Sequence, residues 1–515
     1  MSHIKILWVD DEVDLLKPHI MFLEKKEYSV TTCTNGTDAV ELIGDELFDV
    51  VFLDENMPGL SGLETLNEIK EKRPNLPVIM ITKSEEEMIM EEAIGAKISD
   101  YLIKPVNPNQ ILLSLKKTLE HSRLVTEKTS VNYQKEFRKI AMELAMVNSF
   151  DEWISLYKKL IYWELSLESI TDQSLAEILE SQKLEANGLF FKFIKKNYKK
   201  WLTSSDKPNL SHTLLKDVVF PKLSKSTNTL LIVIDNLRYD QFRIIESKIN
   251  QYYKKEEEIM FYSILPTATQ YARNALFSGL LPSEMEKKYP QYWKNDIDEG
   301  LKNLYENEFL IENLKRSGIN IKHDFIKITN LKAGKQTAEN FKSYKDNNLT
   351  VLVYNFVDMI SHAKTEMEVI KELVGDDKAY RSLTLSWFNN SPLIEIIQKA
   401  QQLGMQLIVT TDHGSINCKN PTKVIGDKEI SSNLRYKTGR SLSYDTNDVY
   451  AEKNPSEIFL PSLSMNSSFI FAKENLFFAY PNNYHHYVNY YKNTYQHGGI
   501  SLEEMIIPCA IFAPK

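Results

Sequence analysis

Aspartate, histidine and threonine residues gather in five short motifs in the C-terminal part of this chain. The motifs are TLLIVIDNLRYD, LPTATQYAR, NFVDMISH, IVTTDHG and YQHGGISLEE, and their candidate residues are Asp235, Thr269, Asp358, His362, Asp412, His413 and His497. Imidazole and carboxylate groups suit Zn²⁺, with Mn²⁺ as a possible substitute. Two such ions stabilise the attacking and leaving oxygens of a phosphoryl transfer. The motifs therefore indicate a two-metal phosphoryl-transfer enzyme.

The spacing within the motifs supports a shared site. Asp358 and His362 are four residues apart, so one helical turn would place both on the same face. Asp412 and His413 follow an apolar run, and the glycine after them allows a sharp turn that would aim both inward. Each motif alone also fits a helix cap, an ion pair or a turn residue. The ordered set of five favours a site.

A second group of polar residues lies near the N-terminus. Asp10 and Asp11 follow the first apolar run, Asp54 ends the third, Thr82 ends the fourth and Lys104 ends the fifth. In a doubly wound sheet these strand ends meet at one edge. Clustered carboxylates there suit Mg²⁺, and a hydroxyl beside an ammonium group could bind an added phosphoryl group. The alternative is a generic flavodoxin-like domain in which the first two aspartates cap a helix.

The elements that must position these residues fall into three parts, which together predict an α/β multidomain chain. In residues 1–121, near-continuous apolar strands alternate with helix-length segments, which predicts a parallel, flavodoxin-like sheet. Residues 122–206 contain no proline and only one glycine, and their periodicity predicts an all-α helical bundle. From 207 to 515 the alternation returns, which predicts a larger α/β domain. The expected strands of the first part are 4–9, 28–33, 49–54, 77–82 and 100–104.

The composition excludes several classes of protein. The 515 residues are 43% hydrophobic and 26% charged, as in an ordinary globular protein. No apolar run reaches the ~18 residues that span a bilayer, so we expect a cytoplasmic protein without membrane insertion. The net charge of −8 argues against broad nucleic-acid binding. The cysteines, Cys33, Cys418 and Cys509, are odd in number and widely spaced, which favours reduced thiols.

The N-terminal residues resemble the receiver domain of two-component response regulators. The resemblance rests on Asp10–Asp11, Asp54-Glu55-Asn56-Met57-Pro58-Gly59, Thr82 and Lys104–Pro105. It implies that a sensor histidine kinase phosphorylates Asp54, and that Mg²⁺ is held by Asp10, Asp11, Asp54 and the Asn56 carbonyl. It also implies that Thr82 and Lys104 contact the phosphoryl group and that Tyr101 is an aromatic switch.

A receiver is a two-state element that the phosphoryl charge biases. The face that dimerises in such domains consists of the fourth helix, the fifth strand and the fifth helix. Here the fifth helix is expected to continue into the helical segment. We therefore expect phosphorylation to reorganise a homodimer and to move the C-terminal domains.

Residues 225–515 resemble the PglZ-type branch of the alkaline phosphatase superfamily. The resemblance implies one zinc site at Asp358, His362 and His497, and a second at Asp235, Asp412, His413 and the Thr269 hydroxyl. It also implies that Thr269 is the nucleophile and forms a phosphothreonine intermediate, because the family nucleophile is the second hydroxyl residue of a P-[ST]-x-[ST] turn that opens a helix. Here that helix is expected to begin near Gln270.

Two neighbours of Thr269 leave alternatives open. Thr267 is the rival nucleophile. Arg273, one turn beyond Thr269, could reach a non-bridging phosphate oxygen as a catalytic residue, or it could be an ordinary surface or core-edge arginine. The Asn-His pair that often follows the threonine in nucleotide phosphodiesterases is absent, since Tyr271 and Ala272 stand there. A nucleotide-type phosphodiester is the preferred substrate class, followed by a phosphomonoester.

The three parts in this order resemble the family of PorX-type response regulators. The resemblance implies control of type IX secretion, a partner histidine kinase, contact with a sigma factor or a secretion-motor component, and phosphodiesterase activity. One alternative is a signalling adaptor whose metal domain only binds partners, and another is a phosphatase or phosphomutase. A DNA-binding regulator is not favoured, because no basic helix-turn-helix module follows the receiver.

Overall fold

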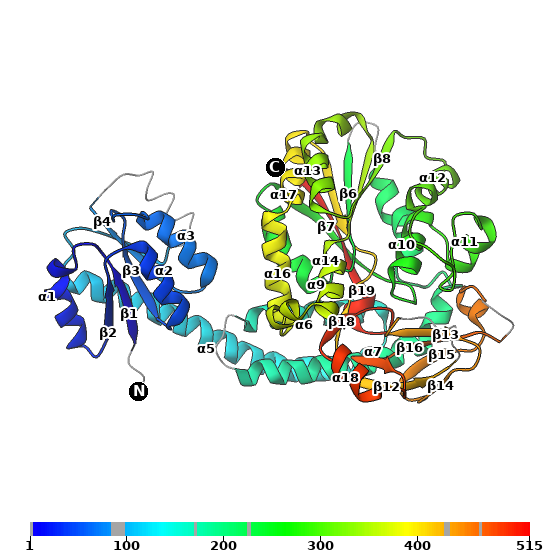
Figure 1. Cartoon of the computed structure of the whole chain (residues 1–515), viewed down its shortest axis with the longest axis horizontal. Coiled ribbons are helices and arrows are strands. Elements are labelled where there is room, and N and C mark those ends of the chain that lie inside the picture. Colours follow the sequence, from blue (N-terminus) through cyan, green and yellow to red (C-terminus); the bar gives the residue numbers. More distant parts are fainter. Residues whose placement is uncertain (1–3, 84–97, 169–172, 224–227, 427–432, 463–465) are drawn as a thin grey trace. The chain divides into compact units, whose positions relative to one another are not determined.

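The chain forms two compact units in a computed structural model (Figure 1). The structure describes residues 4–83, 98–168, 173–223, 228–426, 433–462 and 466–515, apart from the side chains of 120–128, 173 and 368. The first unit lies within Met1–Phe137, and the second comprises Arg138–Glu168 and Gln173–Lys515. The predicted boundaries of the three domains, 1–121, 122–206 and 207–515, stay a prediction.

The first unit contains a five-stranded parallel sheet in the order β2-β1-β3-β4-β5. Its strands are β1 Lys5–Val9, β2 Ser29–Cys33, β3 Val50–Asp54, β4 Val78–Thr82 and β5 Asp100–Ile103, and its helices include α1 Val13–Glu24, α2 Gly36–Asp45 and α3 Gly62–Lys72. This arrangement confirms the predicted doubly wound sheet. The expected fourth helix falls in 84–97, which lies outside the described residues.

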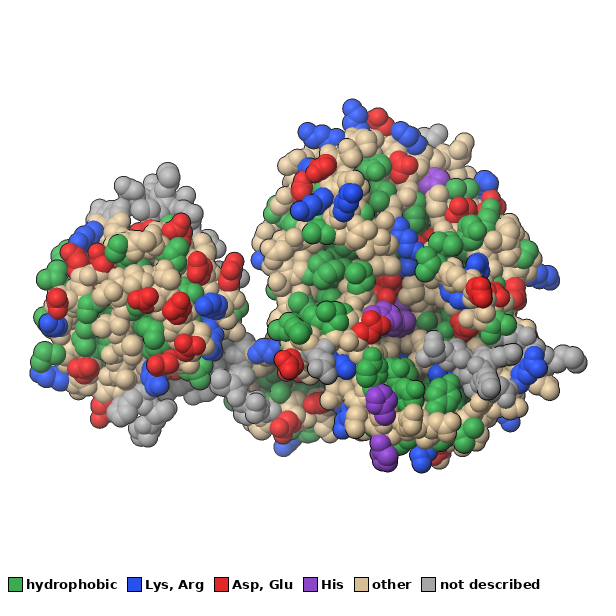
Figure 2. All heavy atoms as spheres, viewed as in Figure 1, with side chains coloured by type: hydrophobic (Ala, Val, Ile, Leu, Met, Phe, Trp, Pro, Cys, Tyr) green, Lys and Arg blue, Asp and Glu red, His purple; other side chains and the backbone are tan. Residues whose placement is uncertain are grey.

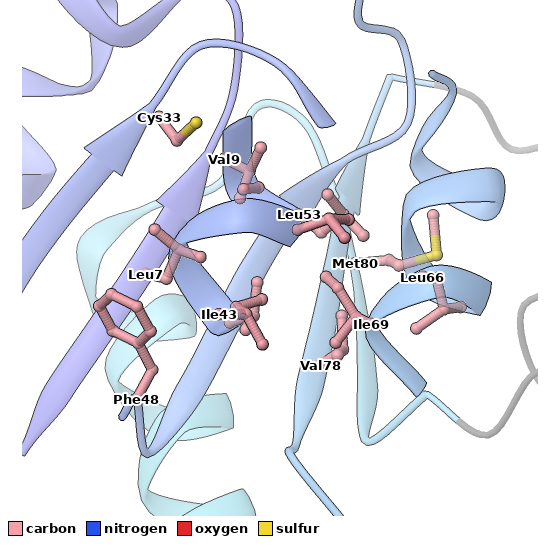
Figure 3. Packing of buried hydrophobic residues seen from close by; sticks show 13 residues of the cluster. Leu7, Val9, Cys33, Ile43, Phe48, Leu53, Leu66, Ile69, Val78 and Met80 are labelled. Atoms are coloured by element: carbon pink, nitrogen blue, oxygen red, sulfur yellow. The ribbon is translucent and has the colours of Figure 1, made fainter. Parts of the chain in front are cut away.

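Side chains from alternate strand residues of this sheet pack into two separate hydrophobic cores, one on each face. The reason is that successive side chains of a strand point to opposite faces. On one face Leu7, Leu53 and Met80 pack with Ile43 of α2 and Leu66 of α3 (Figure 3). The opposite face has its own cluster, built on residues such as Ile6, Trp8, Phe52, Ile79 and Ile81. Apolar packing on both faces holds the strand ends, and therefore the acidic edge, in fixed positions.

Three helices follow the parallel sheet of the first unit, as the sequence predicts: α5 Pro108–Met146, α6 Phe150–Leu167 and α7 Gln173–Trp201. Helix α6 begins with a capping box between Ser149 and Glu152. The ring of Trp201 on α7 is 5.1 Å from the ring of Tyr262, and that of Tyr157 on α6 is 5.9 Å from that of Tyr239. Helices α6 and α7 therefore share aromatic packing with the α/β part of the second unit.

The second unit is built on a six-stranded mixed sheet in the order β7-β19-β10-β6-β9-β8. These strands are β6 Thr229–Ile234, β7 Tyr253–Tyr262, β8 His323–Ile328, β9 Leu349–Tyr354, β10 Gln406–Thr410 and β19 Ile506–Pro514. Strands β10, β6, β9 and β8 are parallel, whereas β19 runs antiparallel to β10 and to β7. This sheet confirms the predicted second α/β domain.

The second unit also contains helices and short strands outside the mixed sheet. The helices are α8 Ser211–Leu214, α9 Tyr239–Ile249, α10 Thr269–Ser278, α11 Pro282–Lys288, α12 Glu306–Arg316, α13 Leu331–Glu339, α14 Phe356–Glu366, α15 Glu368–Leu373, α16 Asp377–Asn390, α17 Pro392–Gln402, α18 Tyr484–Tyr491 and α19 Leu502–Met505. The short strands are β11 Ile416–Cys418, β12 Asn420–Ile425, β13 Tyr436–Gly439, β14 Ser443–Tyr444, β15 Val449–Glu452, β16 Ser468–Ala472, β17 Leu476–Ala479 and β18 Thr494–Gln496. Strand β16 pairs with β13 and β15 in a separate small sheet.

The cysteines agree with a further expectation. Cys33, Cys418 and Cys509 are buried and free, as predicted. Among the residues that the structure describes, no helix is both long enough and apolar enough to cross a membrane.

Candidate functional site

The acidic residues of the first unit meet at one edge of the parallel sheet. Asp10 follows β1 directly, Asp54 is the last residue of the neighbouring β3, and oxygens of Asp10, Asp11 and Asp54 lie within 4.8 Å of one another. Asp10 and Asp54 are buried, whereas Asp11 is exposed. An oxygen-rich pocket of this kind fits Mg²⁺.

Lys104 partly neutralises this pocket. Its Nζ atom is 2.8 Å from Asp10 Oδ2 and 3.1 Å from Asp54 Oδ1. Burial raises the pKa of Asp54, although the Lys104 ammonium group opposes the shift. Burial also disfavours the Lys104 cation, but its bonds with Asp10 and Asp54 outweigh this and raise its pKa. The ammonium group therefore stays charged beside the candidate phosphoacceptor.

The structure places the other candidate receiver residues around the same edge. Thr82 is the last residue of β4 and is buried, and Tyr101 is half-buried on the neighbouring β5. Asn56 is exposed two residues after β3. Their roles in phosphoryl and metal binding stay predictions.

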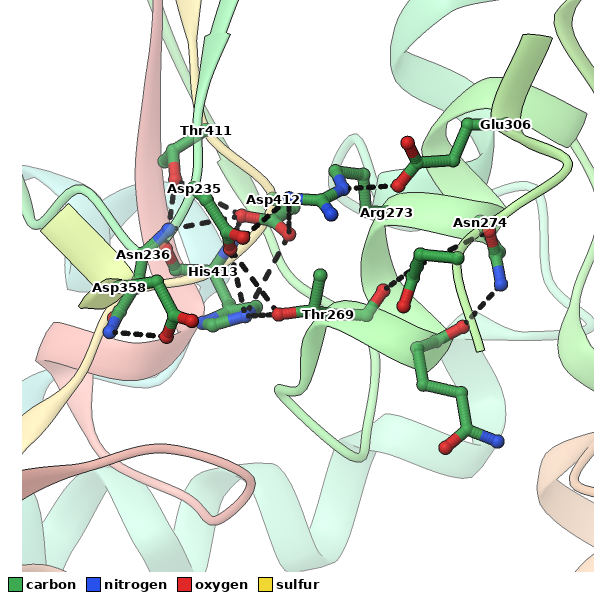
Figure 4. Close-up of polar contacts among 12 residues, drawn as sticks. Asp235, Asn236, Thr269, Arg273, Asn274, Glu306, Asp358, Thr411, Asp412 and His413 are labelled. Carbon is green, nitrogen blue, oxygen red and sulfur yellow. Dashed lines mark hydrogen bonds and ion pairs between the residues drawn. The ribbon is translucent and has the colours of Figure 1, made fainter. Parts of the chain in front are cut away.

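Two adjacent parallel strands position Asp235 and Asp412 of the second unit. Asp235 directly follows β6, and Asp412 lies two residues after β10, the strand paired with β6. The carboxyl ends of paired parallel strands lie at the same sheet edge. Thr269 is the first residue of α10, one position before the expected start of that helix. Figure 4 shows its hydroxyl directed toward Asp235 and His413.

Asp235, Asp412 and His413 form a buried trio. His413 Nε2 is 3.8 Å from Asp235 Oδ1 and 3.7 Å from Asp412 Oδ2. Thr269 Oγ1 is 3.0 Å from His413 Nε2 and donates to Asp235 Oδ1 at 3.3 Å. Asp412 Oδ2 is buried and has no hydrogen-bond partner among the described residues. A buried carboxylate oxygen without a hydrogen-bond partner, beside a second carboxylate and an imidazole, fits a metal site.

Asp358, His362 and His497 form a second, more open trio. Asp358 and His362 lie one turn apart on α14, with His362 Nε2 at 3.4 Å from Asp358 Oδ2. His497 Nε2 is 3.6 Å from Asp358 Oδ1, and its ring stacks on that of His413 at 4.3 Å. The two trios therefore adjoin. Histidine and acidic side chains lie together at the edge of a hollow close to α14 (Figure 2).

The protonation of these side chains shifts in different directions. Burial raises the pKa of Asp235 to about 7 and also raises the pKa of Asp412, although Arg273 opposes both shifts. Burial lowers the pKa of His413, and burial together with His413 lowers the pKa of His497 to about 3. Burial disfavours the Asp358 carboxylate, but His362 and His497 outweigh it and lower its pKa. The hydrogen bond to Asp358 raises the pKa of His362. Neutral imidazoles and ionised carboxylates are the forms that bind metal ions.

The surroundings of the two threonines differ. Thr267 is buried, donates to the Gly499 carbonyl at 2.8 Å and accepts from the Gly498 N–H at 3.0 Å. Its hydroxyl thus fixes the turn after His497, where Gly498 adopts a φ of 117° that favours glycine. Thr269 is half-buried and faces the buried trio. This geometry supports Thr269 as the nucleophile.

Arg273 is 1% exposed, which excludes a surface position. Its Nη1 is 2.5 Å from Asp235 Oδ2, and its Nε donates to Glu306 Oε1 at 2.5 Å. Lys327 Nζ donates to the other oxygen of Glu306 at 2.9 Å. Arg273 therefore holds a candidate metal ligand in place, and its predicted contact with a phosphate oxygen stays a prediction.

Asn236 is a site residue that the sequence motifs did not single out. It adopts a φ of 63°, its N–H donates to Asp412 Oδ1 at 3.3 Å, and its side chain donates to Asp358 Oδ1 at 3.3 Å. It thus links the two trios. Asparagine tolerates this left-handed conformation, so its place after Asp235 at a strand end was a usable signal. Glu306 lies outside every motif, and nothing in the sequence marks it.

Family models match all three parts of the chain. Residues 6–116 match the response regulator receiver domain, residues 123–202 match the PorX response regulator linker domain, and residues 214–512 match the BREX system PglZ alkaline phosphatase-like domain. The last match alone covers more than half of the chain.

Curated proteins and solved structures also match. The chain is 34% identical over 118 residues to the transcriptional regulatory protein ResD of Bacillus subtilis (strain 168), covering 23% of this chain and 49% of ResD. It is 34% identical over 123 residues to the transcriptional regulatory protein ZraR of Klebsiella oxytoca, covering 24% and 28%. The chain thus spans about half or less of these relatives. A CheY-like response regulator receiver domain protein from Methanospirillum hungatei JF-1 is 28% identical, covering 23% of this chain and 96% of that chain, with a TM-score of 0.23.

Proposed function

Because this chain belongs to the PorX-type response regulators, with a PglZ alkaline phosphatase-like effector domain, we propose that it is a phosphorylation-controlled phosphodiesterase that uses two metal ions. The receiver implies a partner histidine kinase, and the buried Asp/Asp/His group suggests a hydrolase. The observation that carries the proposal is the position of Thr269. This residue is the first of helix α10, and its hydroxyl faces the buried Asp/Asp/His group.

Two zinc ions, or Mn²⁺ in their place, would be held by the two trios, with Thr269 as a further ligand of the buried one. When bound, these ions supply Lewis-acid stabilisation of the attacking and leaving oxygens and lower the pKa of the threonine hydroxyl. Arg273 holds Asp235, and Asn236 holds Asp412 and Asp358, so both trios are oriented by hydrogen bonds of the chain itself.

The reaction then follows from the position of Thr269. Its oxygen attacks phosphorus, the Thr269 O–P bond forms as the ester O–P bond breaks, and the hydroxyl proton ends on the departing alcohol. His413 Nε2 and Asp235 Oδ1 lie within 3.3 Å of the hydroxyl oxygen and orient it. The N-terminus of α10 stabilises the phosphoryl oxygens. Water then cleaves the phosphothreonine, which releases a phosphomonoester and restores Thr269.

The receiver supplies the control in this proposal. Asp10, Asp11, Asp54 and the Asn56 carbonyl would hold Mg²⁺, and Asp54 accepts the phosphoryl group from the kinase. Thr82 and Lys104 contact that group, Tyr101 follows Thr82 inward, and a homodimer reorganises. We further propose a nucleotide-type phosphodiester substrate, a cytoplasmic location, and a role in type IX secretion control through a sigma factor or a secretion-motor component. The family match and the receiver pocket support these points.

Hydrolysis of bis-p-nitrophenyl phosphate by the zinc-loaded full chain tests the enzyme proposal. We expect Thr269→Ala to lower kcat at least about 100-fold while zinc stays bound, because the nucleophile is lost but both trios remain. We expect Asp412→Ala to lose both zinc and activity. His485→Ala, which changes an exposed histidine of α18, is the matched control and should behave as the wild type.

Equal activity in the wild type and both site variants would defeat the enzyme proposal. Zinc binding without hydrolysis would instead favour the signalling adaptor with a non-catalytic metal domain. Faster hydrolysis of p-nitrophenyl phosphate than of the diester would favour a phosphatase.

A further inference from the structure

Helix α7 of the linker inserts a buried asparagine into the effector domain. Asn187 is 4% exposed, and its Oδ1 accepts from the Leu502 N–H at 2.8 Å while its Nδ2 donates to Glu503 Oε2 at 3.0 Å. Both partners belong to the short helix α19. One turn earlier on α7, Lys183 Nζ lies 2.7 Å from Glu164 Oε2 of α6 and 3.6 Å from Glu503 Oε1. The linker therefore contacts α19 through two polar side chains, those of Asn187 and Lys183.

Helix α19 in turn supports the loops that carry the candidate metal ligands. The backbone carbonyl of Glu504 accepts from the Gly414 N–H at 3.2 Å, directly after His413. The Glu504 side chain accepts from the Gly499 N–H at 2.9 Å, two residues after His497. A Cβ atom on Gly414 would lie 2.1 Å from the Glu503 carbonyl oxygen, so this loop packs against α19 without space for a side chain. Helix α19 therefore contacts both of the loops that follow His413 and His497.

We propose that Asn187 is a positioning residue of the effector metal centre, which acts through α19 on His413 and His497. This inference rests on the proposed function, since it concerns the metal site of that same reaction. The linker is then part of the support of the site as well as a connection between domains. Partners that orient metal ligands commonly contribute tenfold to a hundredfold in metal affinity.

The energetics of the contact favour a local effect. Asn187 satisfies one backbone N–H and one carboxylate, so an apolar replacement leaves both buried groups without this partner, which is costly at each group. The contact between Asn187 and α19 is polar. It lies beside a cavity of about 540 Å³, which is lined by residues of α7 and by others that include Arg238, Asp377 and Glu503. Arg435 binds Glu504 independently, with Nη2 at 2.7 Å from Oε2. Loss of the Asn187 bonds should therefore displace α19 without unfolding the domain.

The test compares Asn187→Leu with Asn197→Leu in the full-length chain. Asn197 lies on the same helix, and in the described part of the chain its side chain donates to the Phe193 carbonyl one turn earlier, at 2.9 Å. Zinc affinity is measured by competition with a chromophoric chelator, and the ligand geometry by the visible spectrum of the Co²⁺-loaded chain. We expect Asn187→Leu to weaken zinc binding by about tenfold to a hundredfold and to change the Co²⁺ spectrum. Asn197→Leu should keep wild-type values for both.

Wild-type zinc affinity and an unchanged Co²⁺ spectrum in Asn187→Leu would overturn the inference. A wild-type chain that binds no zinc would instead overturn the proposed function, so the two failures are distinguishable. If Asn187→Leu does not fold, Asn187→Ser, which is smaller and polar, is tested by the same two measurements. Weaker zinc binding in that variant, with the thermal midpoint of its metal-free form unchanged, supports the positioning role. Unchanged zinc binding contradicts it.

Discussion

The neutral rings of His413 and His497, stacked 4.3 Å apart, join the two trios into one centre. Burial keeps both imidazoles in the form that a cation requires, so metal binding at neutral pH needs no proton release from them. The same burial has a cost in acid, because a protonated imidazole is poorly solvated there.

A buried histidine outside the two trios, His212, should make the metal-free effector domain less stable in acid. Burial lowers the pKa of His212 to about 3, with Lys207 as a smaller cause, and its Nδ1 has no hydrogen-bond partner among the described residues. Between that pKa and the unfolded value of about 6.5, the unfolded chain binds more protons than the folded chain. Stability is therefore complete above about pH 6.5 and falls as the pH drops toward 3.

The free energy of unfolding of the wild type falls between pH 7 and pH 5. We expect this fall to be smaller by roughly 1–2 kcal/mol in His212→Gln, which has no imidazole to protonate. Urea unfolding of the wild type and the variant, in chelator at both pH values, measures the difference. An identical loss in the two proteins would show that His212 does not carry this acid sensitivity.

At the residue scale the sequence was informative where a side chain belongs to a motif. Asp235, Asp412 and His413 were predicted together and lie together, as do Asp358 and His362. The supporting residues were harder to find. Glu306 reaches Arg273 only because α12 packs beside α10, and no local pattern records a contact between distant elements.

The elements explain why two motifs far apart in the chain form one site. Strands β6 and β10 are neighbours in the sheet although well over a hundred residues separate them, so Asp235 and Asp412 emerge side by side. Apolar runs predicted both strands, since parallel buried strands are apolar throughout. Their adjacency, and the antiparallel strand β19 beside β10, depend on long-range pairing that no local pattern encodes.

Helix α14 carries His362, the most exposed candidate ligand of the open trio. The His362 side chain is 62% exposed, whereas the Asp358 side chain is 17% exposed. We expect His362→Ala to lower the zinc stoichiometry from about two ions per chain to about one, because the buried trio keeps all its ligands. Its thermal midpoint without metal should change little, since an exposed side chain is lost. Metal analysis after gel filtration measures the stoichiometry, with His485→Ala as the control, and two retained ions in His362→Ala would contradict the assignment.

At the scale of the whole molecule, the linker helices connect the receiver sheet to the effector domain in the chain and also pack against the effector domain. Helix α5 begins directly after the receiver sheet, and α6 and α7 pack on the effector through rings such as those of Tyr157 and Trp201. The sequence predicted the helices from their periodicity and their lack of proline. It did not predict that α7 would hydrogen-bond the backbone of α19, because that contact depends on tertiary packing.

Phosphorylation should act on the whole chain through Asp54. We expect acetyl phosphate with Mg²⁺ to shift the sedimentation of the wild type toward the homodimer. The reason is that a phosphoryl group on Asp54 changes the charge at the acidic edge of the receiver sheet. Asp54→Asn should show no shift. Asp49→Asn, which changes an exposed aspartate before the same strand, should respond as the wild type. Unchanged sedimentation of the wild type after verified phosphorylation would count against a phosphorylation-driven dimer.

The central claim is that two metal ions and Thr269 form a diester-cleaving centre. A zinc titration of the metal-free, full-length chain, followed through bis-p-nitrophenyl phosphate hydrolysis, tests it most directly. The predicted result is a rate that rises with added zinc and reaches its plateau at two bound ions per chain. A chain that binds two zinc ions and hydrolyses the diester no faster than zinc in buffer would contradict the claim.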